Sequence, residues 1–426
     1  MRDRRFGMGQ IQKKDGVVMP KSDLIVGLDL GTTKICAVVG QMTPSGVDVI
    51  GIGTSPSTGL RKGVVVNIEQ TVQSIKRALE EAELMAGCEI RSVYAGIAGS
   101  HIKGFNSHGV IAVKGGEVTS RDMDRVIDAA KAVAIPLDRE VIHILPQEYI
   151  VDDQRGIADP LGMAGVRLEV KVHIVTGAVS SAQNIVRSCH RSGLDVSDIV
   201  LESLGSAKAA LTEEEREIGV ALVDIGGGTT DLAIFSDDSI KHTSVLAIGG
   251  TNLTSDIAFG LRTPMASAEK IKVDYGCALA DLIPEDETIL VDSVGGRDPR
   301  ELSRLVLSEI CEPRMEELLA LVDQELVRSG FKDKIGAGVV LTGGSALIEG
   351  VQDLAEQIFN MPTRVGYPIG LGGLTDVVNS PMYATAVGLL LYGAKKEGTE
   401  DRFRIRDKNV FNRILGRMRK WFSDIS

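Results

Sequence analysis

Two short stretches of the chain place an aspartate just before glycine and paired threonines. They are VGLDLGTTK (26–34) and ALVDIGGGTTD (221–231). In each, an apolar strand runs into the aspartate, and the glycine then lets the turn bring backbone N–H groups against an anion. Because a carboxylate repels phosphate, Asp29 and Asp224 are expected to hold a divalent cation through water. Together the two turns predict a clamp on a magnesium-bound polyphosphate.

Each turn taken singly also fits a tight hairpin with no ligand, and the repetition argues against coincidence. Neither turn matches G-x-x-x-x-G-K-[ST] or G-x-G-x-x-G in the required strand-to-helix context. A third segment, GVVLTGGSALIEGV (338–351), predicts a buried strand, a small-residue turn and a helix. Backbone exposed at a helix start suits a flat ligand or its phosphates, although a plain strand–turn–helix joint has the same pattern.

Apolar periodicity predicts an α/β chain built from two similar halves. Strands are expected at 24–30, 35–40, 47–53 and 92–99, with a helix at 68–87. Residues from about 100 to 170 differ in texture and predict a small α+β insert, after which 170–179 is expected to rejoin the main sheet. The second half restarts at 218–235, so the repeat predicts two halves that face each other across a cleft.

The overall composition excludes several classes of protein. The 426 residues carry a formal net charge of −11, which argues against a nucleic-acid partner. The five cysteines stand singly, which favours reduced thiols in a cytosolic protein and gives no sign of zinc. Residues 1–22 contain no apolar core of a secretory signal and predict a disordered arm. No apolar run reaches the roughly 18 residues that a spanning helix needs.

The chain ends in NVFNRILGRMRKWFSDIS (409–426), which differs from the acidic remainder. Apolar residues recur there at steps of three and four, with a tryptophan beside the stripe, and the basic residues lie mainly on the other side. An interfacial amphipathic helix has this pattern. A terminal helix docked on its own protein and a calmodulin-type target are the alternatives. The predicted membrane-contacting residues are Phe411, Ile414, Leu415, Met418, Trp421, Phe422, Arg413, Arg417, Arg419 and Lys420.

The order DxGTTK, DIGGGTTD and LTGGSALIEG resembles the phosphate 1, phosphate 2 and adenosine motifs of the actin/Hsp70/sugar-kinase superfamily. Residues 248–272, the insert, residues 380–394 and the tail resemble the FtsA family of bacterial cell division proteins. The resemblance covers roughly residues 23–426. It implies an α/β, actin-like (ribonuclease H-like) two-lobed ATPase fold with an inserted small α+β subdomain and a C-terminal amphipathic helix.

The resemblance also divides the chain. The expected parts are a disordered arm (1–22), the lobe 1 core 1A (23–97 and 171–216), the insert 1C (98–170), the lobe 2 core 2A (217–245 and 336–380), the outer subdomain 2B (246–335), a helix returning to lobe 1 (381–394), a charged linker (395–408) and the membrane-targeting helix (409–426).

The superfamily motifs assign site residues to this sequence. The implied ligands are ATP and Mg²⁺, with Asp29 and Asp224 on the metal, and Glu202 is implied to position the attacking water. A carboxylate favoured by a helix N-terminus is the alternative for Glu202, and a surface ion pair is the alternative for Glu269 and Lys272. The implied nucleotide-binding residues are Asp29, Gly31, Thr32, Thr33, Lys34, Asp224, Gly226, Gly227, Gly228, Thr229, Thr230, Glu269, Lys272, Gly343, Gly344 and Ser345.

The family resemblance implies a function in division. The expected protein has at most weak ATPase activity, forms actin-like filaments, and tethers the FtsZ ring to anionic lipids at the cytoplasmic face of the membrane at the septum. Later divisome proteins are expected to meet the insert. A small-molecule kinase of the superfamily, or an actin-like filament protein of the rod-shape or pilus-assembly type, is the alternative. A chaperone of the Hsp70 type is disfavoured, because the nucleotide-binding core takes up nearly the whole chain.

Overall fold

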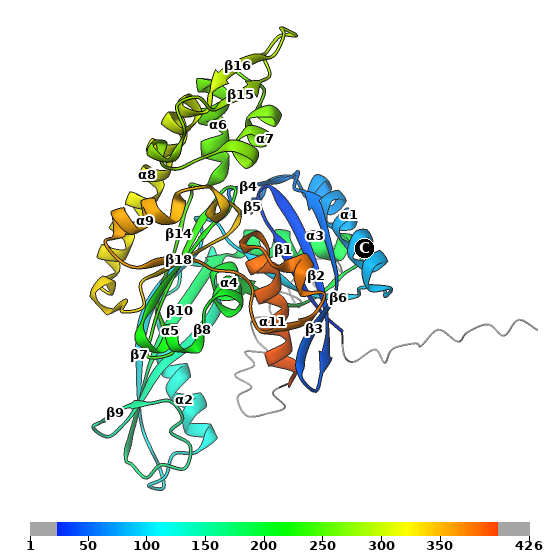
Figure 1. Ribbon diagram of the computed structural model, residues 1–426. Helices are drawn as coiled ribbons and strands as arrows, with labels where there is room; N and C mark the ends of the chain where they lie inside the picture. The colour runs from blue at the N-terminus through cyan, green and yellow to red at the C-terminus, as the bar shows by residue number, and fades with distance from the viewer. Residues whose placement is uncertain (1–23, 399–426) are drawn as a thin grey trace, which may run out of the picture.

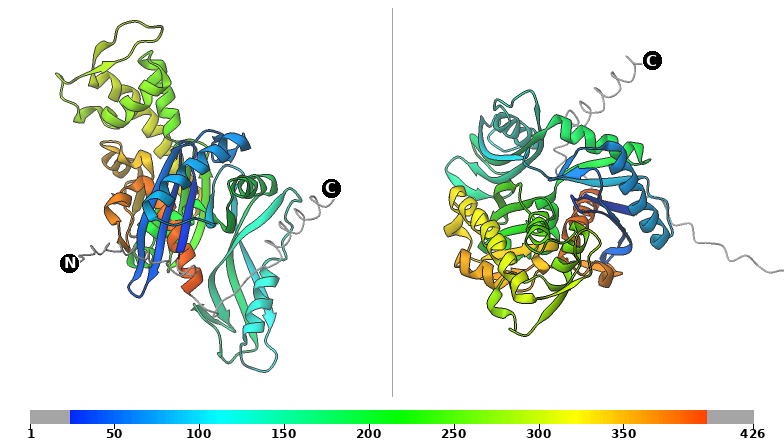
Figure 2. Two further views of the ribbon diagram at one scale, coloured as in Figure 1. Left: turned by 90° about the vertical axis from the view of Figure 1, so that its right-hand side faces the viewer. Right: turned by 90° about the horizontal axis from the view of Figure 1, so that it is seen from above.

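The protein is described by a computed structural model that covers residues 24–398 (Figure 1). Two lobes lie side by side, an insert extends from one end and an outer subdomain from the other (Figures 1 and 2). The arm predicted for 1–22 and the amphipathic helix predicted for 409–426 lie outside the described residues. The fold class predicted from the sequence is otherwise confirmed.

Lobe 1 is built on a six-stranded sheet in the order β11-β6-β1-β2-β3-β19. Neighbours β1, β2 and β3 are antiparallel, and β6, β11 and β19 pair in parallel. Both faces of this sheet are covered, which explains why β1 reads as a continuous apolar run. The strands are β1 (Leu24–Leu30), β2 (Lys34–Thr43), β3 (Gly46–Pro56), β6 (Ser92–Ile97), β11 (Asp195–Leu201) and β19 (Leu371–Gly373), with a separate hairpin of β4 (Leu60–Arg61) and β5 (Val64–Val65).

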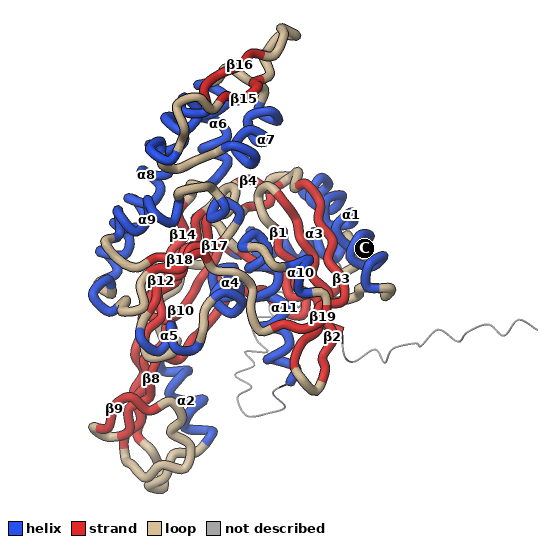
Figure 3. The backbone as a smooth tube through the Cα atoms, in the orientation of Figure 1, coloured by secondary structure: helices blue, strands red, loops and turns tan. Residues whose placement is uncertain are grey.

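Helices α1 (Ile68–Ala86) and α3 (Val179–Arg191) pack on one face of that sheet. Helix α1 begins where the Asn67 side chain accepts the Gln70 N–H, and it ends where Gly87 takes a φ of 66°. The other face is covered by α11 (Ala384–Gly398), with the short α10 (Thr375–Val378) nearby. Figure 3 shows α11 lying between this sheet and α4 (Glu202–Ala210).

Lobe 2 repeats the arrangement with the strand order β14-β13-β12-β17-β18. Three antiparallel strands are again followed by two parallel ones, so the two halves predicted from the repeated motif are confirmed. The strands are β12 (Val220–Ile225), β13 (Thr230–Ser236), β14 (Ser239–Leu246), β17 (Val339–Thr342) and β18 (Thr363–Val365).

Helices and one small hairpin complete lobe 2. Helix α4 packs between the lobes, because its small residues meet β12 and β13 on one side and α11 on the other. The outer subdomain forms the upper end of Figure 1. The elements are α5 (Glu213–Ile218), α6 (Gly250–Gly260), α7 (Met265–Tyr275), η1 (Ala280–Leu282), β15 (Thr288–Val291), β16 (Arg300–Ser303), α8 (Arg304–Ser329), η2 (Lys332–Lys334), η3 (Gly344–Leu347), α9 (Val351–Phe359) and η4 (Pro381–Tyr383).

The insert is a four-stranded sheet in the order β7-β10-β8-β9 with one helix against it. Alternate residues of β10 (Leu168, Val170, Val172 and Ile174) are buried against α2. Helix α2 begins at a capping box between Thr119 and Asp122. The elements are β7 (Lys103–Ala112), α2 (Ser120–Ala130), β8 (Arg139–Val151), β9 (Gln154–Ile157) and β10 (Arg167–Ala178).

Two expectations from the sequence are wrong. Residues 170–179 do not rejoin the main sheet, because β10 pairs with β7 and β8 inside the insert. The predicted linker at 395–408 begins too early, because α11 continues to Gly398. There Lys396 forms an ion pair with Asp198 and lies over the Tyr392 ring, which holds the last turn on lobe 1.

Helix α11 crosses α4 at two glycines, and this crossing supplies a test of the fold. A Cβ added to Gly388 would lie 1.7 Å from the Gly205 carbonyl oxygen, so Gly388→Ala must push the helices apart. We expect a loss of about 1–3 kcal/mol of stability from such overpacking, measured by denaturant unfolding. Lys395→Ala, at an exposed position of the same helix, should change stability by less than about 0.5 kcal/mol. Equal effects of the two substitutions would contradict the packing described.

Candidate nucleotide-binding site

The two predicted turns touch each other at the base of the cleft. A Cβ added to Gly227 would lie 2.4 Å from the Thr33 side chain, and one added to Gly228 would lie 2.5 Å from Thr32. The threonines of the first turn therefore lie directly against the glycines of the second. Only glycine fits at these two positions while the turns remain in contact, so the turns form one site.

A cavity of about 230 Å³ opens beside this contact. It is lined by every predicted nucleotide-binding residue except Thr230. The Thr230 hydroxyl is instead buried and donates to the Ile248 carbonyl oxygen at 2.9 Å, so its role in the structure is to hold β13 to the residues after β14. Glu202, predicted to position water, also lines the cavity at the first position of α4.

Four carboxyl groups line this cavity: Asp29, Asp224 and Asp231 are buried, and Glu202 is partly buried. Burial raises the pKa of Asp29 to about 7, the nearby Lys34 opposes that rise, and the neighbouring Asp224 adds to it. Burial and then the charges of Asp29, Asp231 and Asp224 raise the pKa of Glu202 well above its usual value. Burial also raises the pKa of Asp224, although hydrogen bonds from Ser206 and Thr385 oppose the shift. The site therefore concentrates carboxyl groups whose ionised forms repel one another.

Asp231 is a site residue that the sequence reasoning did not single out. It lines the cavity, pairs with Asp224 across the β12–β13 hairpin, and has an Oδ1 with no hydrogen-bond partner. Burial and then the charge of Asp224 raise its pKa to about 8. The sequence does contain a signal for Asp231. The equivalent position of the first turn is Cys36, opposite Asp29, and it carries no charge, so the second turn has an additional carboxyl group.

Asp224 is held in place by groups from several elements. Its Oδ2 accepts from the Ser206 hydroxyl of α4 and, at 3.0 Å, from the Thr385 hydroxyl of α11. Gly343 follows β17 with a φ of 85°, and a Cβ there would lie 2.3 Å from Asp224 Oδ1. The glycine-rich loop after β17 thus needs glycine both for its backbone conformation and for its approach to the carboxylate.

Two lysines supply the cations at the site: Lys34, and Lys272 of the E-x-x-K pair. Lys34 Nζ donates to the Met382 carbonyl oxygen at 2.8 Å and lies 4.1 Å from the centre of the Tyr383 ring. Lys272 Nζ lies 2.8 Å from Glu269 Oε2 and 3.0 Å from the Thr254 hydroxyl. Lys272 is buried and lines the cavity, whereas the Glu269 side chain of this ion pair is 45% exposed.

Apolar side chains at the mouth of the cavity were also missed from the sequence. Val273 on α7 and Leu347 on η3 line it, yet 71% and 49% of their surfaces are exposed. Large apolar residues exposed beside polar groups suit a flat ligand that needs apolar surface on its faces. The helix predicted to follow the glycines begins as the short η3, and α9 starts only at Val351.

Two features are absent from residues 24–398. No group of three or more His, Cys, Asp or Glu side chains there could hold a metal ion by itself. Within the same range, no helix is long and apolar enough to cross a bilayer.

Comparison with solved structures defines the class of fold. The PilM–PilN type IV pilus biogenesis complex aligns with a TM-score of 0.63 and 16% identity over 87% of this chain and 98% of that chain. MreB5 of Spiroplasma citri bound to ADP aligns with a TM-score of 0.53 and 17% identity over 89% and 98%. The duplicated sheets and these likenesses define an actin-like fold.

Comparison of sequences identifies the family. The family model for cell division protein FtsA matches residues 221–388, and the model for the SHS2 domain inserted in FtsA matches residues 99–176. The chain is 58% identical over 375 residues to cell division protein FtsA of Pseudomonas aeruginosa, in an alignment that covers 88% of this chain and 90% of the relative. It is 45% identical over 378 residues to that of Escherichia coli K12, with coverage of 87% and 90%. The chain belongs to the FtsA family of cell division proteins.

The buried carboxyl groups predict how stability depends on pH. The raised pKa of Asp231 keeps its proton in the folded protein up to about pH 8, whereas the unfolded chain loses it near the usual value of 3.8. Between these values the folded state binds more protons, so stability falls as pH rises. Asp231→Asn should therefore raise stability by about 1–3 kcal/mol at pH 8 and by progressively less towards pH 4, measured by thermal melting.

Glu80→Gln is the matched control, because Glu80 is an exposed carboxylate on α1. It should change the melting temperature little at either pH. A pH-independent effect of Asp231→Asn would show that the carboxyl group is not held in its neutral form.

Proposed function

We propose that the chain binds ATP with Mg²⁺ in this cavity and works as an actin-like cell division protein. The observation that carries the proposal is that both turns, the E-x-x-K pair and the glycine-rich loop line one cavity. Backbone N–H groups and threonine hydroxyls of the turns bind the phosphates, and Lys34 balances their charge. Glu269 and Lys272 contact the ribose and base, beside Gly343, Gly344 and Ser345.

The residues present fit a magnesium ion that is held mainly by phosphate and water. Asp29 and Asp224 supply carboxylate oxygens, and the unpartnered Oδ1 of Asp231 supplies a further buried acceptor. No cluster of three such side chains is close enough to bind the ion alone, within the part of the chain that the structure covers. Mg²⁺ keeps several waters and is commonly held by one or two carboxylates and the substrate phosphates. When bound, it would neutralise phosphate charge and relieve the repulsion among the carboxylates.

Glu202 is the candidate for positioning a water at the terminal phosphate. Burial and the neighbouring carboxylates raise its pKa, so positive charge entering the site would favour the ionised form that accepts a proton from water. Hydrolysis is accordingly slow, and the nucleotide acts chiefly as a switch for conformation and assembly.

The tail is proposed to tether the protein to the cytoplasmic face of the membrane. Each basic residue near anionic lipid contributes about 1 kcal/mol. A fully buried large apolar side chain contributes roughly 1.5–3 kcal/mol, and burial at an interface is partial. Ordering the helix opposes these gains, so a single tail binds reversibly. Filaments that present many tails bind far more firmly through effective concentration.

This arrangement connects the division ring to the membrane. The proposed partners are FtsZ, further copies of this chain in actin-like filaments, anionic lipids at the septum, and later divisome proteins that meet the insert. The family assignment supports these partners, since the FtsA models match both the second half and the insert. It also favours this function over a small-molecule kinase.

Removing either aspartate of the two turns tests the nucleotide site. Asp29→Ala and Asp224→Ala should each weaken magnesium-dependent ATP binding by at least about tenfold, measured by titration calorimetry, because a charge-assisted contact is lost. Asp124→Ala, at an exposed position of α2, is the control and should bind ATP normally. Unchanged ATP binding by both pocket variants would refute the proposed site.

Removing residues 409–426 tests the tether. The truncated protein should no longer co-sediment with anionic liposomes, whereas its ATP affinity should be unchanged. Removing residues 1–22, which also contain several basic residues, is the control and should leave liposome binding intact. Liposome binding that survives loss of the tail would show that another surface carries it.

A further inference from the structure

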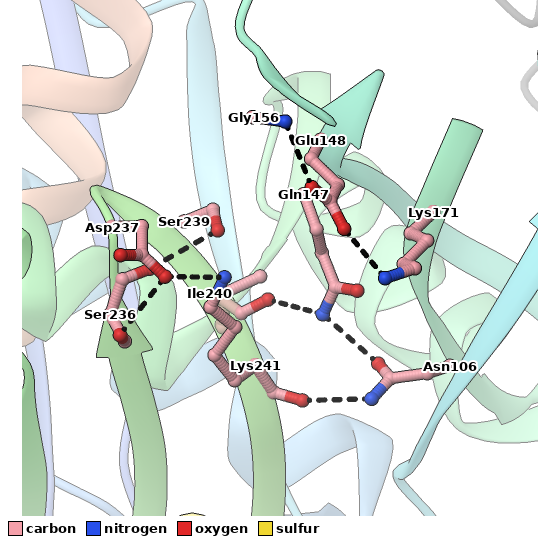
Figure 4. A network of polar contacts seen from close by, with 10 residues as sticks. All are labelled: Asn106, Gln147, Glu148, Gly156, Lys171, Ser236, Asp237, Ser239, Ile240 and Lys241. Carbon is pink, nitrogen blue, oxygen red and sulfur yellow. Dashed lines mark hydrogen bonds and ion pairs between the residues drawn. The ribbon is translucent and has the colours of Figure 1, made fainter. Parts of the chain in front are cut away.

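The insert touches lobe 2 as well as the lobe from which it emerges. Asn106 Nδ2 donates to the Lys241 carbonyl oxygen at 3.1 Å, and Gln147 Nε2 donates to the Ile240 carbonyl oxygen at 2.7 Å (Figure 4). Gln147 Nε2 also lies 3.2 Å from Asn106 Oδ1, so β7 and β8 act together. We call this set of contacts between the insert and β14 the latch.

The latch forms at an irregularity in an edge strand. Ile240 pairs with Phe235 and His242 with Ile234, which leaves Lys241 as an extra residue on β14. Because β14 is the last strand of its sheet, this bulge turns carbonyl groups outward, where the insert donates to them. The two insert amides therefore satisfy backbone groups that the sheet of lobe 2 leaves unpaired.

A buried histidine completes the latch. His173 Nδ1 lies 2.7 Å from Asn106 Oδ1, and its Nε2 lies 2.8 Å from the Thr243 hydroxyl. Since Asn106 donates through Nδ2, its Oδ1 accepts, so the histidine proton is on Nδ1 and Thr243 donates to Nε2. Burial lowers the pKa of His173 to about 4, so this arrangement persists at neutral pH. Gly104 fits closely, because a Cβ there would lie 2.3 Å from the Thr243 hydroxyl.

Strand β14 leads from the latch to the cavity. Shortly after Thr243, the Gly250 N–H donates to the Gly226 carbonyl oxygen at 2.9 Å, and the Thr251 N–H donates to the Gly227 carbonyl oxygen at 2.7 Å. These two acceptors belong to the second phosphate turn, which lines the cavity. We therefore expect a shift of β14 to move Gly226 and Gly227, which belong to the turn proposed to bind the phosphates.

The insert is also connected to the first turn. The Gly63 N–H donates to the Thr32 hydroxyl at 3.0 Å, and a Cβ on Gly63 would lie 3.0 Å from the backbone of Ala98 and Gly99. Gly99 lies at the N-terminal boundary of the insert. The insert thus contacts both lobes: it begins beside the segment that bonds the first turn, and it reaches the second turn only through β14, whose far end pairs with Thr230.

From these contacts we propose that the insert is a third connection between the lobes, and that the latch couples its position to nucleotide in the cavity. The inference rests on the proposed function, because it needs ATP to bind between the two turns. In the structure the latch is formed while the turns are in contact. A ligand that joins the turns therefore favours the latched arrangement, and by reciprocity the latch strengthens ligand binding.

The test compares latch variants in the full-length protein, with Mg²⁺ and ATP as the probe. Asn106→Ala and Thr243→Val should each weaken ATP binding about five- to tenfold by calorimetry. In the unaltered protein, ATP should increase protection from hydrogen exchange at 104–108, 145–149 and 239–244, and the variants should lose that increase. Thr243→Ser, which keeps the hydroxyl, should behave as the unaltered protein does.

Ser107→Ala is the matched control, because that hydroxyl lies on the same strand as Asn106 but bonds to Ala130 inside the insert. Melting curves verify that each variant folds. If Asn106→Ala does not fold, the comparison between Thr243→Val and Thr243→Ser tests the coupling. Normal affinity and unchanged exchange in the folded latch variants would overturn the coupling alone. Failure of the unaltered protein to bind ATP would overturn the proposed function, and the coupling with it.

Discussion

The contact between the two threonine–glycine turns is the constraint on which the rest of the structure depends. Thr32 and Thr33 lie so close to Gly228 and Gly227 that no side chain fits between them. This contact brings the carboxyl groups of both lobes into one poorly solvated space, where desolvation and mutual repulsion raise their pKa values. Under the proposed function, a bound cation would neutralise these groups and return the free energy that the fold loses by gathering them. The same geometry would then account both for an instability of the site and for affinity towards a metal-bound anion.

The two halves of the internal repeat have the same backbone arrangement but different side chains at their turns. Apart from β19, both sheets have the same strand order, and each begins with a hairpin whose first strand carries an aspartate at its end. Opposite that aspartate lies Cys36 in lobe 1 and Asp231 in lobe 2. The additional carboxyl group is thus on the side where the glycine-rich loop and α4 also meet Asp224. Two otherwise similar turns therefore differ in the titratable groups that they bring to the cavity.

Much of the fold, and most of the polar residues that line the candidate site, could be predicted from the sequence, because both depend on local signals. Apolar periodicity identifies β1 and α1, and the duplicated Asp-Gly-Thr pattern identifies the turns. What could not be predicted depends on distant partners. Strand β10 has the pattern of any half-buried strand, and only its pairing with β7 and β8 assigns it to the insert. Asp231 stands within the second motif, yet its importance arises from burial beside Asp224. Thr230 matched the motif, but its hydroxyl turns into the core to bond Ile248.

The α4–α11 interface and the interface between the insert and β14 differ in the kinds of side chain that form them. Helices α4 and α11 meet through glycines, alanines and leucines, and packing of that kind is costly to displace. The hydrogen bonds of the latch between the insert and β14 come instead from amides, a histidine and a hydroxyl, and Leu145 of the insert packs beside them against the apolar cluster that contains Ile240. Each of those hydrogen bonds can be exchanged for one to water at a net cost of about 1 kcal/mol. Interfaces of this polar character permit relative motion of domains. The core that joins the lobes is therefore the more rigid connection, and under the proposed coupling a bound nucleotide would bias the insert through the polar contacts of the latch.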